Sequence, residues 1–240
     1  MRYFTGFTLC LAALLAFATP LRADITTNPS RMVLDENDRA GAVNVHNSGG
    51  HSLRIETGWT AIAQGPDGVL HPIPQGAAPK DTRGLHLCPQ VFTLKPGDTR
   101  AVYVVLDPKS PVQDERHVHI RIDADRVNGK GPRWGLTLPV FVREAAMPVS
   151  AQISDAHWVG PQSLMVSLYR EDGATPYGRL IASNDRGEIL GELGNITLYA
   201  NRQTIQYEIP LERLPEGALI VSYLGSGEFE NQVFDSRQMH

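Results

Sequence analysis

Short segments of alternating apolar and polar residues follow one another along the chain after residue 24, and turn-forming residues separate them. Ala42–Asn47 ends at Ser-Gly-Gly, Thr99–Leu106 follows Lys-Pro-Gly-Asp, and His117–Ala124 alternates strictly. A period of two residues is typical of strands with one buried face. No helical period persists for more than two turns before residue 200. The pattern therefore predicts an all-β chain built from β-sandwiches.

The same reading assigns the remaining segments. Gly65–Arg83 is rich in Gly and Pro and is predicted to be a loop, and Gly58 is expected to form a bulge. Leu211–Gly217 is predicted to be a helical turn or a simple connection, and Asn231–His240 is expected to fray. The other predicted strands are Ile25–Leu34, Leu53–Ile62, Gln90–Leu94, Trp134–Arg143, Val149–Val159, Ser163–Tyr169, Arg179–Ser183, Glu188–Leu190, Asn195–Tyr199, Thr204–Ile209 and Ala218–Leu224.

The first 23 residues have the pattern of a secretory signal peptide. Arg2 supplies a positive start, and the apolar run Phe7–Ala18 is 12 residues long, short of the roughly 20 that a membrane-spanning helix needs. Cleavage after Ala23 would leave 217 residues, enough for two domains of about 100 residues each. We expect a signal peptide at 1–23, an immunoglobulin-like domain at 24–147 and a second β-sandwich at 148–240.

Charge and motifs exclude several function classes. After loss of Arg2 and Arg22, 20 basic residues stand against 26 acidic ones, and this acidic balance argues against nucleic acid as a partner. Cys88 is then the one cysteine left, so no disulfide can form within the mature chain, and we expect a small buried thiol. The sequence has none of the nucleophile-elbow, phosphate-loop or metalloprotease motifs. We therefore predict no enzyme activity, no cofactor and no small-molecule substrate.

Two pairs of residues have the spacing of metal ligands. His117 and His119 share one face of a strand, and so do His86 and Cys88. If the two strands were neighbours, the four side chains could hold zinc or copper. The core face of the strand is expected to carry Val118, Ile120 and Ile122. The two histidines would therefore point outward. We therefore predict no metal site, and these four residues are the candidates for one if the prediction fails.

The stretch Trp134–Arg143 is apolar but interrupted by Pro139. Proline has no N–H for the ladder and is confined to edge strands, strand starts or bulges. One interpretation is therefore an edge strand that can be lent to the sheet of a partner. The other is an ordinary buried strand with a bulge at Pro139.

Three segments resemble the PapD-like periplasmic pilus chaperones. Asn28-Pro-Ser-Arg31-Met-Val-Leu34 is similar to their first strand, where an arginine precedes an apolar run. Leu87–Val104 contains Pro89-Gln-Val-Phe92-Thr-Leu-Lys-Pro-Gly, similar to the family pattern P-x-x-F-x-L-x-P-G. Gln113–Ile120 stands where the family has an acidic-arginine segment. The similarity covers residues 24–147, and beyond them it consists only of size and strand content.

The resemblance implies a mechanism and partners. Arg31 would hold the C-terminal carboxylate of an incomplete pilus or fimbrial subunit, and the edge strand would complete that subunit's sandwich, which is donor strand complementation. An outer-membrane usher would receive the subunit, and the location would be the periplasm. The side chains expected on the donated edge are Trp134, Leu136, Leu138 and Val140.

The chain departs from the family pattern at one anchor. Pro139 stands where the family has a lysine, four residues before an arginine that matches Arg143. A second cation would have to come from elsewhere, and Arg121, Lys130 and Arg133 are the candidates by proximity in sequence. Arg143 is expected to pair across the domain junction, with an acidic position that falls on Arg116, or on Glu115 after a shift of one residue.

The leading prediction is therefore a periplasmic assembly chaperone. The alternative is a secreted two-sandwich adhesion or carbohydrate-binding protein, because the same scaffold hosts many functions. Trp59, Trp134 and Trp158 are far apart in sequence, which disfavours a sugar-binding face of clustered aromatics.

Overall fold

The computed structural model describes residues 24–73, 80–129, 131 and 133–239. The predicted signal peptide and Lys130 lie outside the described residues. All regular elements of the described part are strands, apart from two single turns of 3-10 helix, η1 (Lys80–Thr82) and η2 (Gly227–Phe229). The all-β prediction is confirmed. In the described residues no helix has the length and apolar character to cross a membrane.

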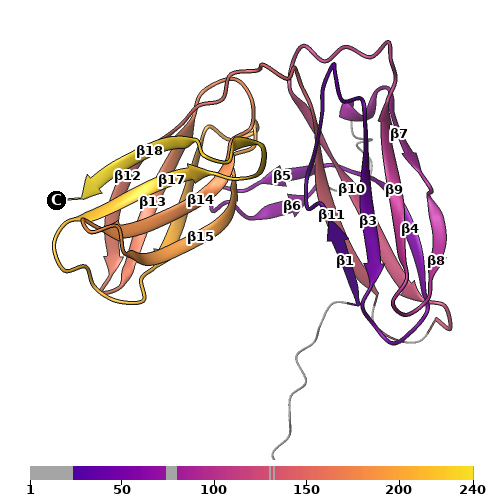
Figure 1. Ribbon diagram of the computed structural model, residues 1–240, viewed down its shortest axis with the longest axis horizontal. Helices are drawn as coiled ribbons and strands as arrows, with labels where there is room; N and C mark the ends of the chain where they lie inside the picture. Colours follow the sequence, from indigo (N-terminus) through magenta and orange to yellow (C-terminus); the bar gives the residue numbers. More distant parts are fainter. Residues whose placement is uncertain (1–23, 74–79, 130, 132, 240) are drawn as a thin grey trace, which may run out of the picture.

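Residues 25–142 form the first sandwich from a four-stranded and a five-stranded sheet (Figure 1). The four-stranded sheet has the order β1-β3-β9-β7, with β1 (Ile25–Asn28), β3 (Ala40–Asn47), β9 (Thr99–Leu106) and β7 (Leu85–Cys88). The five-stranded sheet has the order β2-β11-β10-β4-β8, with β2 (Met32–Leu34), β11 (Trp134–Val142), β10 (Arg116–Arg126), β4 (Leu53–Thr60) and β8 (Val91–Leu94).

The first predicted strand is divided between the two sheets. Its N-terminal part, β1, pairs with β3, whereas β2 pairs in parallel with the end of β11, Val140 opposite Met32. Pro29 lies in the crossing and, lacking an N–H, cannot continue a ladder there. Arg31 is thereby held between two sheets, directly before β2.

The strand β11 has one free edge over most of its length. It pairs with β10 from Val142 to Trp134 without a register shift, so Pro139 makes no bulge and the bulge interpretation is wrong. On its other side β2 covers only Val140–Val142. Within the described residues, 134–139 therefore have no ladder partner on that side. The bulge expected at Gly58 is also absent, because β4 pairs with β10 in regular register.

Residues 151–239 form the second sandwich from sheets of three and four strands. The three-stranded sheet has the order β12-β13-β16, with β12 (Ala151–Gly160), β13 (Ser163–Arg170) and β16 (Thr204–Pro210). The four-stranded sheet has the order β15-β14-β17-β18, with β15 (Ile189–Thr197), β14 (Tyr177–Asn184), β17 (Leu219–Gly225) and β18 (Val233–Met239). We propose the domain boundary at residues 147/148, between β11 and β12.

The last strand, β18, corrects the expectation that the C-terminal residues fray. It pairs with β17 from Met239 to Val233, and Phe234 stacks on the buried ring of Tyr223 at 4.9 Å between centroids. The Asp235 carboxylate also accepts a hydrogen bond of 2.8 Å from the N–H of Ile153. Leu211–Gly217, by contrast, is a connection without a helical turn.

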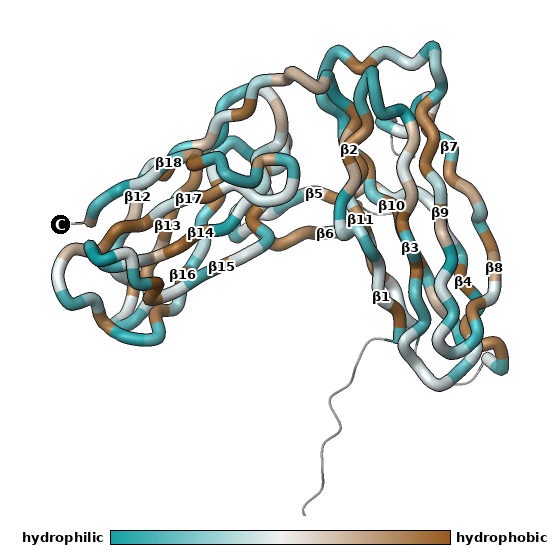
Figure 2. The backbone as a smooth tube through the Cα atoms, viewed as in Figure 1, coloured by the Kyte–Doolittle hydropathy of each residue, from teal (hydrophilic) through white to brown (hydrophobic). Residues whose placement is uncertain are grey.

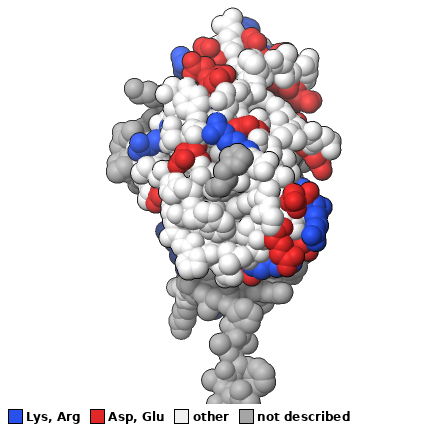
Figure 3. All heavy atoms as spheres, turned by 90° about the vertical axis from the view of Figure 1, so that its left-hand side faces the viewer, with Lys and Arg blue, Asp and Glu red and all other residues white. Residues whose placement is uncertain are grey.

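Each sandwich encloses its own apolar core. Val43, Ile55 and Ile120 lie in the first core and Ile153, Leu180 and Val221 in the second, none exposed by more than 1%. Figure 2 shows how hydrophobic and hydrophilic residues alternate along the strands. On the face in Figure 3, basic and acidic side chains are interspersed rather than separated by sign.

A hairpin that the sequence did not predict lies between the two sandwiches (Figure 1). It consists of β5 (Ile62–Gln64), which follows the predicted strand Leu53–Ile62, and β6 (Leu70–Pro72), which lies in the segment Gly65–Arg83 predicted to be a loop. Both strands are three residues long, too short for alternation to be recognised. We call residues 62–72 the docked hairpin, because its polar groups bind the second sandwich.

Candidate functional site

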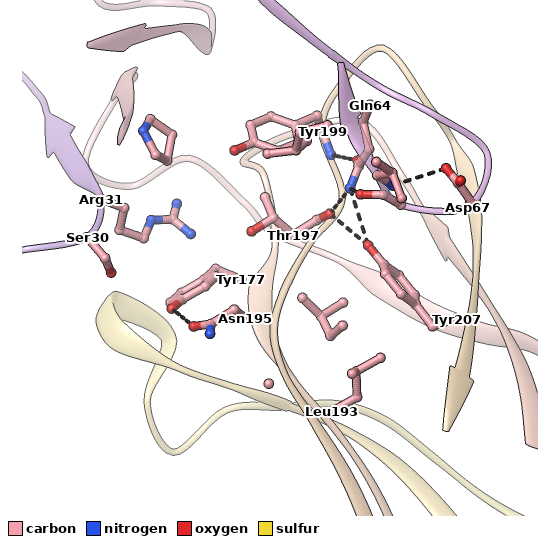
Figure 4. A pocket seen from close by; sticks show the side chains of 16 residues that line it. Ser30, Arg31, Gln64, Asp67, Tyr177, Leu193, Asn195, Thr197, Tyr199 and Tyr207 are labelled. Atoms are coloured by element: carbon pink, nitrogen blue, oxygen red, sulfur yellow. Dashed lines mark hydrogen bonds between the residues drawn. The ribbon is translucent and has the colours of Figure 1, made fainter. Parts of the chain in front are cut away.

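A pocket of about 420 Å³ lies where the two sandwiches and the docked hairpin meet (Figure 4). Figure 4 shows Arg31 and Tyr177 on one side and Gln64, Thr197 and Tyr207 on the other. The first sandwich contributes Ser30, Arg31 and Pro139; the hairpin contributes Gln64 and Asp67–Leu70; the second sandwich contributes Tyr177, Leu193–Thr197, Tyr199 and Tyr207.

The Arg31 guanidinium is covered on both faces, and the nitrogen atoms along its edge are buried without a hydrogen bond to the described residues. Its central carbon lies 4.5 Å from the ring centre of Phe141 and 4.4 Å from that of Tyr177, and the side chain is only 10% exposed. Its Nη2 lies 2.9 Å from Glu228 Oε1, although the geometry is not that of a hydrogen bond. Nε and Nη1 have no partner among the described residues. A planar anion arriving in the plane of the guanidinium would find these donors available.

Arg31 belongs to a chain of alternating charges that crosses between the sandwiches, which we call the interdomain charge cluster: Glu115, Arg143, Glu228 and Arg31. Arg143 donates to Glu115 at 2.9 Å and to Glu228 at 3.1 Å. The Glu115 side chain, 4% exposed, also accepts hydrogen bonds from the backbone N–H and the hydroxyl of Thr175 in the second sandwich. The register shifted by one residue therefore describes the acidic partner, and Arg116 instead donates to the carbonyls of Asp81 and Arg83.

Burial lowers the pKa of Arg31 below its ordinary value, because desolvation disfavours the charged form. The carboxylate of Glu228 opposes this shift, and the positive charge of Arg143 adds to it. A second carboxylate at the free edge of Arg31 would replace part of the lost solvation. The site is therefore suited to an anion that binds without most of its hydration shell.

The docked hairpin closes the pocket on the side opposite Arg31. The Gln64 side chain, in a residue only 3% exposed, accepts from the N–H of Tyr199 at 2.9 Å. Its amide donates to the carbonyl of Thr197 at 2.7 Å and to the hydroxyl of Tyr207 at 3.2 Å. The backbone carbonyl of Gln64 accepts hydrogen bonds from the side chains of Asn201 and Arg202. One buried glutamine thus holds the hairpin to β15, to β16 and to the segment between these strands.

The histidines of β10 are not on an open surface. His119 is 1% exposed, its Nε2 lies 3.3 Å from the hydroxyl of Tyr199, and its Nδ1 has no described partner. His117 packs on the same tyrosine ring at 4.9 Å. Both histidines lie on the face of β10 that points away from its own core, as predicted, but at His119 the second sandwich covers this outer face. Burial lowers the pKa of His119 to about 3, with the neighbouring His117 acting in the same direction.

The two predicted second cations that the structure describes, Arg121 and Arg133, do not join Arg31. Arg121 pairs with Asp123 at 3.0 Å and lines a separate hollow beside Leu136 and Thr137. Arg133 is 60% exposed and lies 3.5 Å from the same aspartate. The guanidinium that shares an acid with Arg31 is Arg143, through Glu228.

The four side chains expected on the donated edge differ in exposure. Leu138 and Val140 are 1% and 0% exposed and lie in the core of their own sandwich. Trp134 and Leu136 pack against that core but remain partly exposed. Only these two can offer apolar surface to a partner without opening the first sandwich.

The proposed metal ligands lie in different sheets. His86 and Cys88 are on β7 of the four-stranded sheet, whereas His117 and His119 are on β10 of the five-stranded sheet. No group of three His, Cys, Asp or Glu side chains in the described ranges is arranged to hold a metal ion. Cys88 is exposed, contrary to the expectation of a buried thiol, because its strand turns it away from the core.

Sequence reasoning missed the side of the pocket that the second half provides. Tyr177, Tyr199, Tyr207 and Glu228 lie in segments without a recognised motif, and they meet only through the packing of the two sandwiches. Gln64 lies between the predicted strand Leu53–Ile62 and the predicted loop Gly65–Arg83, in a short segment without an assignment. The spacing of these residues along the chain carries no signal of this arrangement.

No protein-family model and no curated protein sequence matches the chain. Solved structures do match it, over nearly its whole length. The YadV chaperone is 8% identical, covers 90% of this chain and 100% of its own, and has a TM-score of 0.50. The Pseudomonas aeruginosa CupB2 chaperone is 12% identical, with coverages of 89% and 97% and a TM-score of 0.51.

A third match is the CsuC–CsuE chaperone–tip adhesion subunit pre-assembly complex from the archaic chaperone-usher Csu pili of Acinetobacter baumannii. It is 12% identical, with coverages of 90% and 98% and a TM-score of 0.51. This chain has the two-domain β-sandwich fold of the PapD-like pilus chaperones. At these identities the likeness establishes the fold, and function depends on the residues of the site.

Proposed function

We propose that this chain is a periplasmic chaperone that binds incomplete immunoglobulin-like pilus or fimbrial subunits. The observation that carries the proposal is Arg31, a buried cation with two unpartnered nitrogen atoms at the pocket between the sandwiches. Buried donors are almost always satisfied, so such a group points to an acceptor supplied by a partner. The C-terminal carboxylate of a subunit is an acceptor of the right charge and shape.

The free edge of β11 supports strand addition to the same partner. Pro139 lines the Arg31 pocket, and residues 134–139 lead away from it along that edge. A strand whose carboxylate is held at Arg31 would therefore run parallel to β11, with its C-terminus at the pocket. Trp134 and Leu136 would contribute apolar contacts, and backbone N–H and C=O groups would contribute most of the affinity. Pro139 removes one donor from this edge.

The remaining parts of the proposal follow from the fold and the predicted signal peptide. The chaperone would work in the periplasm without a cofactor or catalysis, and it would deliver subunits to an outer-membrane usher. The CsuC–CsuE complex, with the same fold, pairs a chaperone with a tip adhesion subunit, which supports this partner class.

The test is capture of partner subunits from a periplasmic extract by the tagged chain, followed by mass spectrometry. We expect the wild-type chain to capture small secreted β-sandwich subunits and Arg31→Met to lose at least tenfold in yield. Glu228 keeps Arg143 as a partner in this variant, so the fold should survive.

Arg179→Met is the matched control, because Arg179 is half exposed, pairs with Glu192 and does not line the pocket. Its yield should equal that of the wild-type chain. Leu136→Asp should lose capture as well, because a charge cannot enter an apolar partner core. Equal yields from Arg31→Met and the wild-type chain would contradict the carboxylate anchor.

A further inference from the structure

We propose that the pocket beside Arg31 binds the last side chain of the partner subunit and selects large apolar or aromatic residues there. The inference rests on the proposed function, since the same carboxylate would be held at Arg31. Its basis is a cavity that extends well beyond the guanidinium. At about 420 Å³ it falls within the range of roughly 300–1,000 Å³ typical of small-ligand pockets. A carboxylate alone would leave most of it empty.

The lining away from Arg31 is mostly apolar. Leu193 and Ile196 come from β15, the edge strand of the second sandwich, and Pro139 faces them from β11. Val69 and Leu70, 51% and 41% exposed, add apolar surface from the docked hairpin. Transfer of an apolar side chain from water to an apolar surface is favourable, so the lining favours an apolar side chain as the occupant.

The tyrosines present rings rather than hydroxyls. The hydroxyl of Tyr177 donates to Asn195 Oδ1 at 2.9 Å, and that of Tyr207 donates to the carbonyl of Thr197 at 3.3 Å. The amide of Gln64 also donates to the Tyr207 hydroxyl. With these polar tips engaged, the ring of Tyr207 and the part of the Tyr177 ring that Arg31 does not cover offer apolar contact to a ligand, and aromatic partners pack favourably against such rings.

Charge separates the two ends of the pocket. Arg31 lies at one end, and the exposed Asp67, whose carboxylate accepts from the N–H of Val69, lies on the hairpin rim. An acidic last residue would bring a second negative charge toward Asp67. Pro139 places an apolar ring where the resembling family has a lysine. Contacts with the last side chain would therefore replace part of the affinity that a second cation would provide.

The experiment uses the purified chain and synthetic nine-residue peptides that differ only in their last residue. Free acids ending in Phe, Leu, Ala or Asp are compared by calorimetric titration, together with the amide of the Phe peptide. We expect the Phe and Leu acids to bind about tenfold or more tightly than the Ala acid, which corresponds to the burial of one large side chain. The Asp acid should bind most weakly of the four.

A glycine pair provides matched variants. Gly194 lines the pocket, and a Cβ added to it would meet no atom within 4 Å, so Gly194→Trp fills space with little disturbance of the fold. The ratio between the Phe and Ala affinities should then fall toward one. Gly50, in the turn after β3, is equally open, and Gly50→Trp should keep the wild-type ratio.

The outcomes separate the two proposals. Equal affinity for all four acids, with weaker binding of the amide, would overturn side-chain selection and leave the Arg31 anchor in place. Equal affinity for acid and amide, or no binding of any peptide, would contradict the carboxylate anchor itself and the selection that depends on it. An unchanged Phe-to-Ala ratio in Gly194→Trp would place the selecting contact outside this pocket.

Discussion

The two sandwiches are joined at two places that use opposite chemistry. The interdomain charge cluster joins them through buried ions, Glu115, Arg143, Glu228 and Arg31. The docked hairpin joins them through neutral hydrogen bonds centred on Gln64. Removing one buried ion leaves its partner uncompensated, whereas removing one neutral partner costs only its hydrogen bonds. The cluster should therefore be the more sensitive attachment, and the hairpin the more tolerant one.

The largest expected effect is on the charge cluster. Arg143→Met removes the cation between Glu115 and Glu228 and should lower the free energy of unfolding by about 3 kcal/mol, at the low end for a broken buried pair because Thr175 still donates to Glu115. Urea denaturation measures the loss. Arg179→Met, which breaks an exposed pair, should change it by less than about 1 kcal/mol. Similar losses in the two variants would contradict the view that the buried ions of the cluster stabilise the fold more than an exposed pair does.

The next effect is a pH dependence on the hairpin side, where His119 contacts Tyr199. Its pKa of about 3 in the folded chain lies below the ordinary 6.5, so the unfolded chain binds more protons between these values. Stability should therefore fall as pH drops from about 6.5 toward 3, with a slope of up to about 1.4 kcal/mol per pH unit from this residue. His119→Phe should flatten the profile, measured by urea denaturation at several pH values.

Exposed His51 supplies the control for this profile. His51→Phe should keep the wild-type slope. If His119→Phe also keeps the wild-type slope, the acid sensitivity arises from other residues. The hairpin side would then contribute no pH dependence.

The smallest effect is expected from the hairpin itself. Gln64→Ala leaves the N–H of Tyr199 and the carbonyl of Thr197 without their partner and should cost about 1–3 kcal/mol. Gln152→Ala, which removes an exposed bond to Glu171, should cost close to nothing. Small-angle scattering would show whether the sandwiches separate. A loss greater than that of Arg143→Met would reverse the proposed order of the two attachments.

Alternation predicted most strands of the first sandwich because each has one face in its own core. The same reasoning could not reveal that His119 is buried, since alternation shows which face meets the core but not what covers the other face. Here a second sandwich covers it. Pro139 was interpretable as an edge residue because the missing N–H constrains any ladder.

The residues of the candidate site also differ in whether the sequence could reveal them. Arg31 and Arg143 were found through the resemblance of the first half, and the structure places both on Glu228. The tyrosines of the second half and Gln64 of the hairpin could not be found, because their positions depend on how two separate cores pack. The strand β18 was missed because, of its described residues, only Phe234 and Met239 pack against the second core.

The four members of the interdomain charge cluster carry two positive and two negative charges, so the cluster has no net charge. A neutral cluster on an acidic protein exerts little long-range pull on an anion. The association rate constant would then be that of an encounter without electrostatic steering, and it would depend little on ionic strength. Selectivity between partners would lie in the dissociation rate constant.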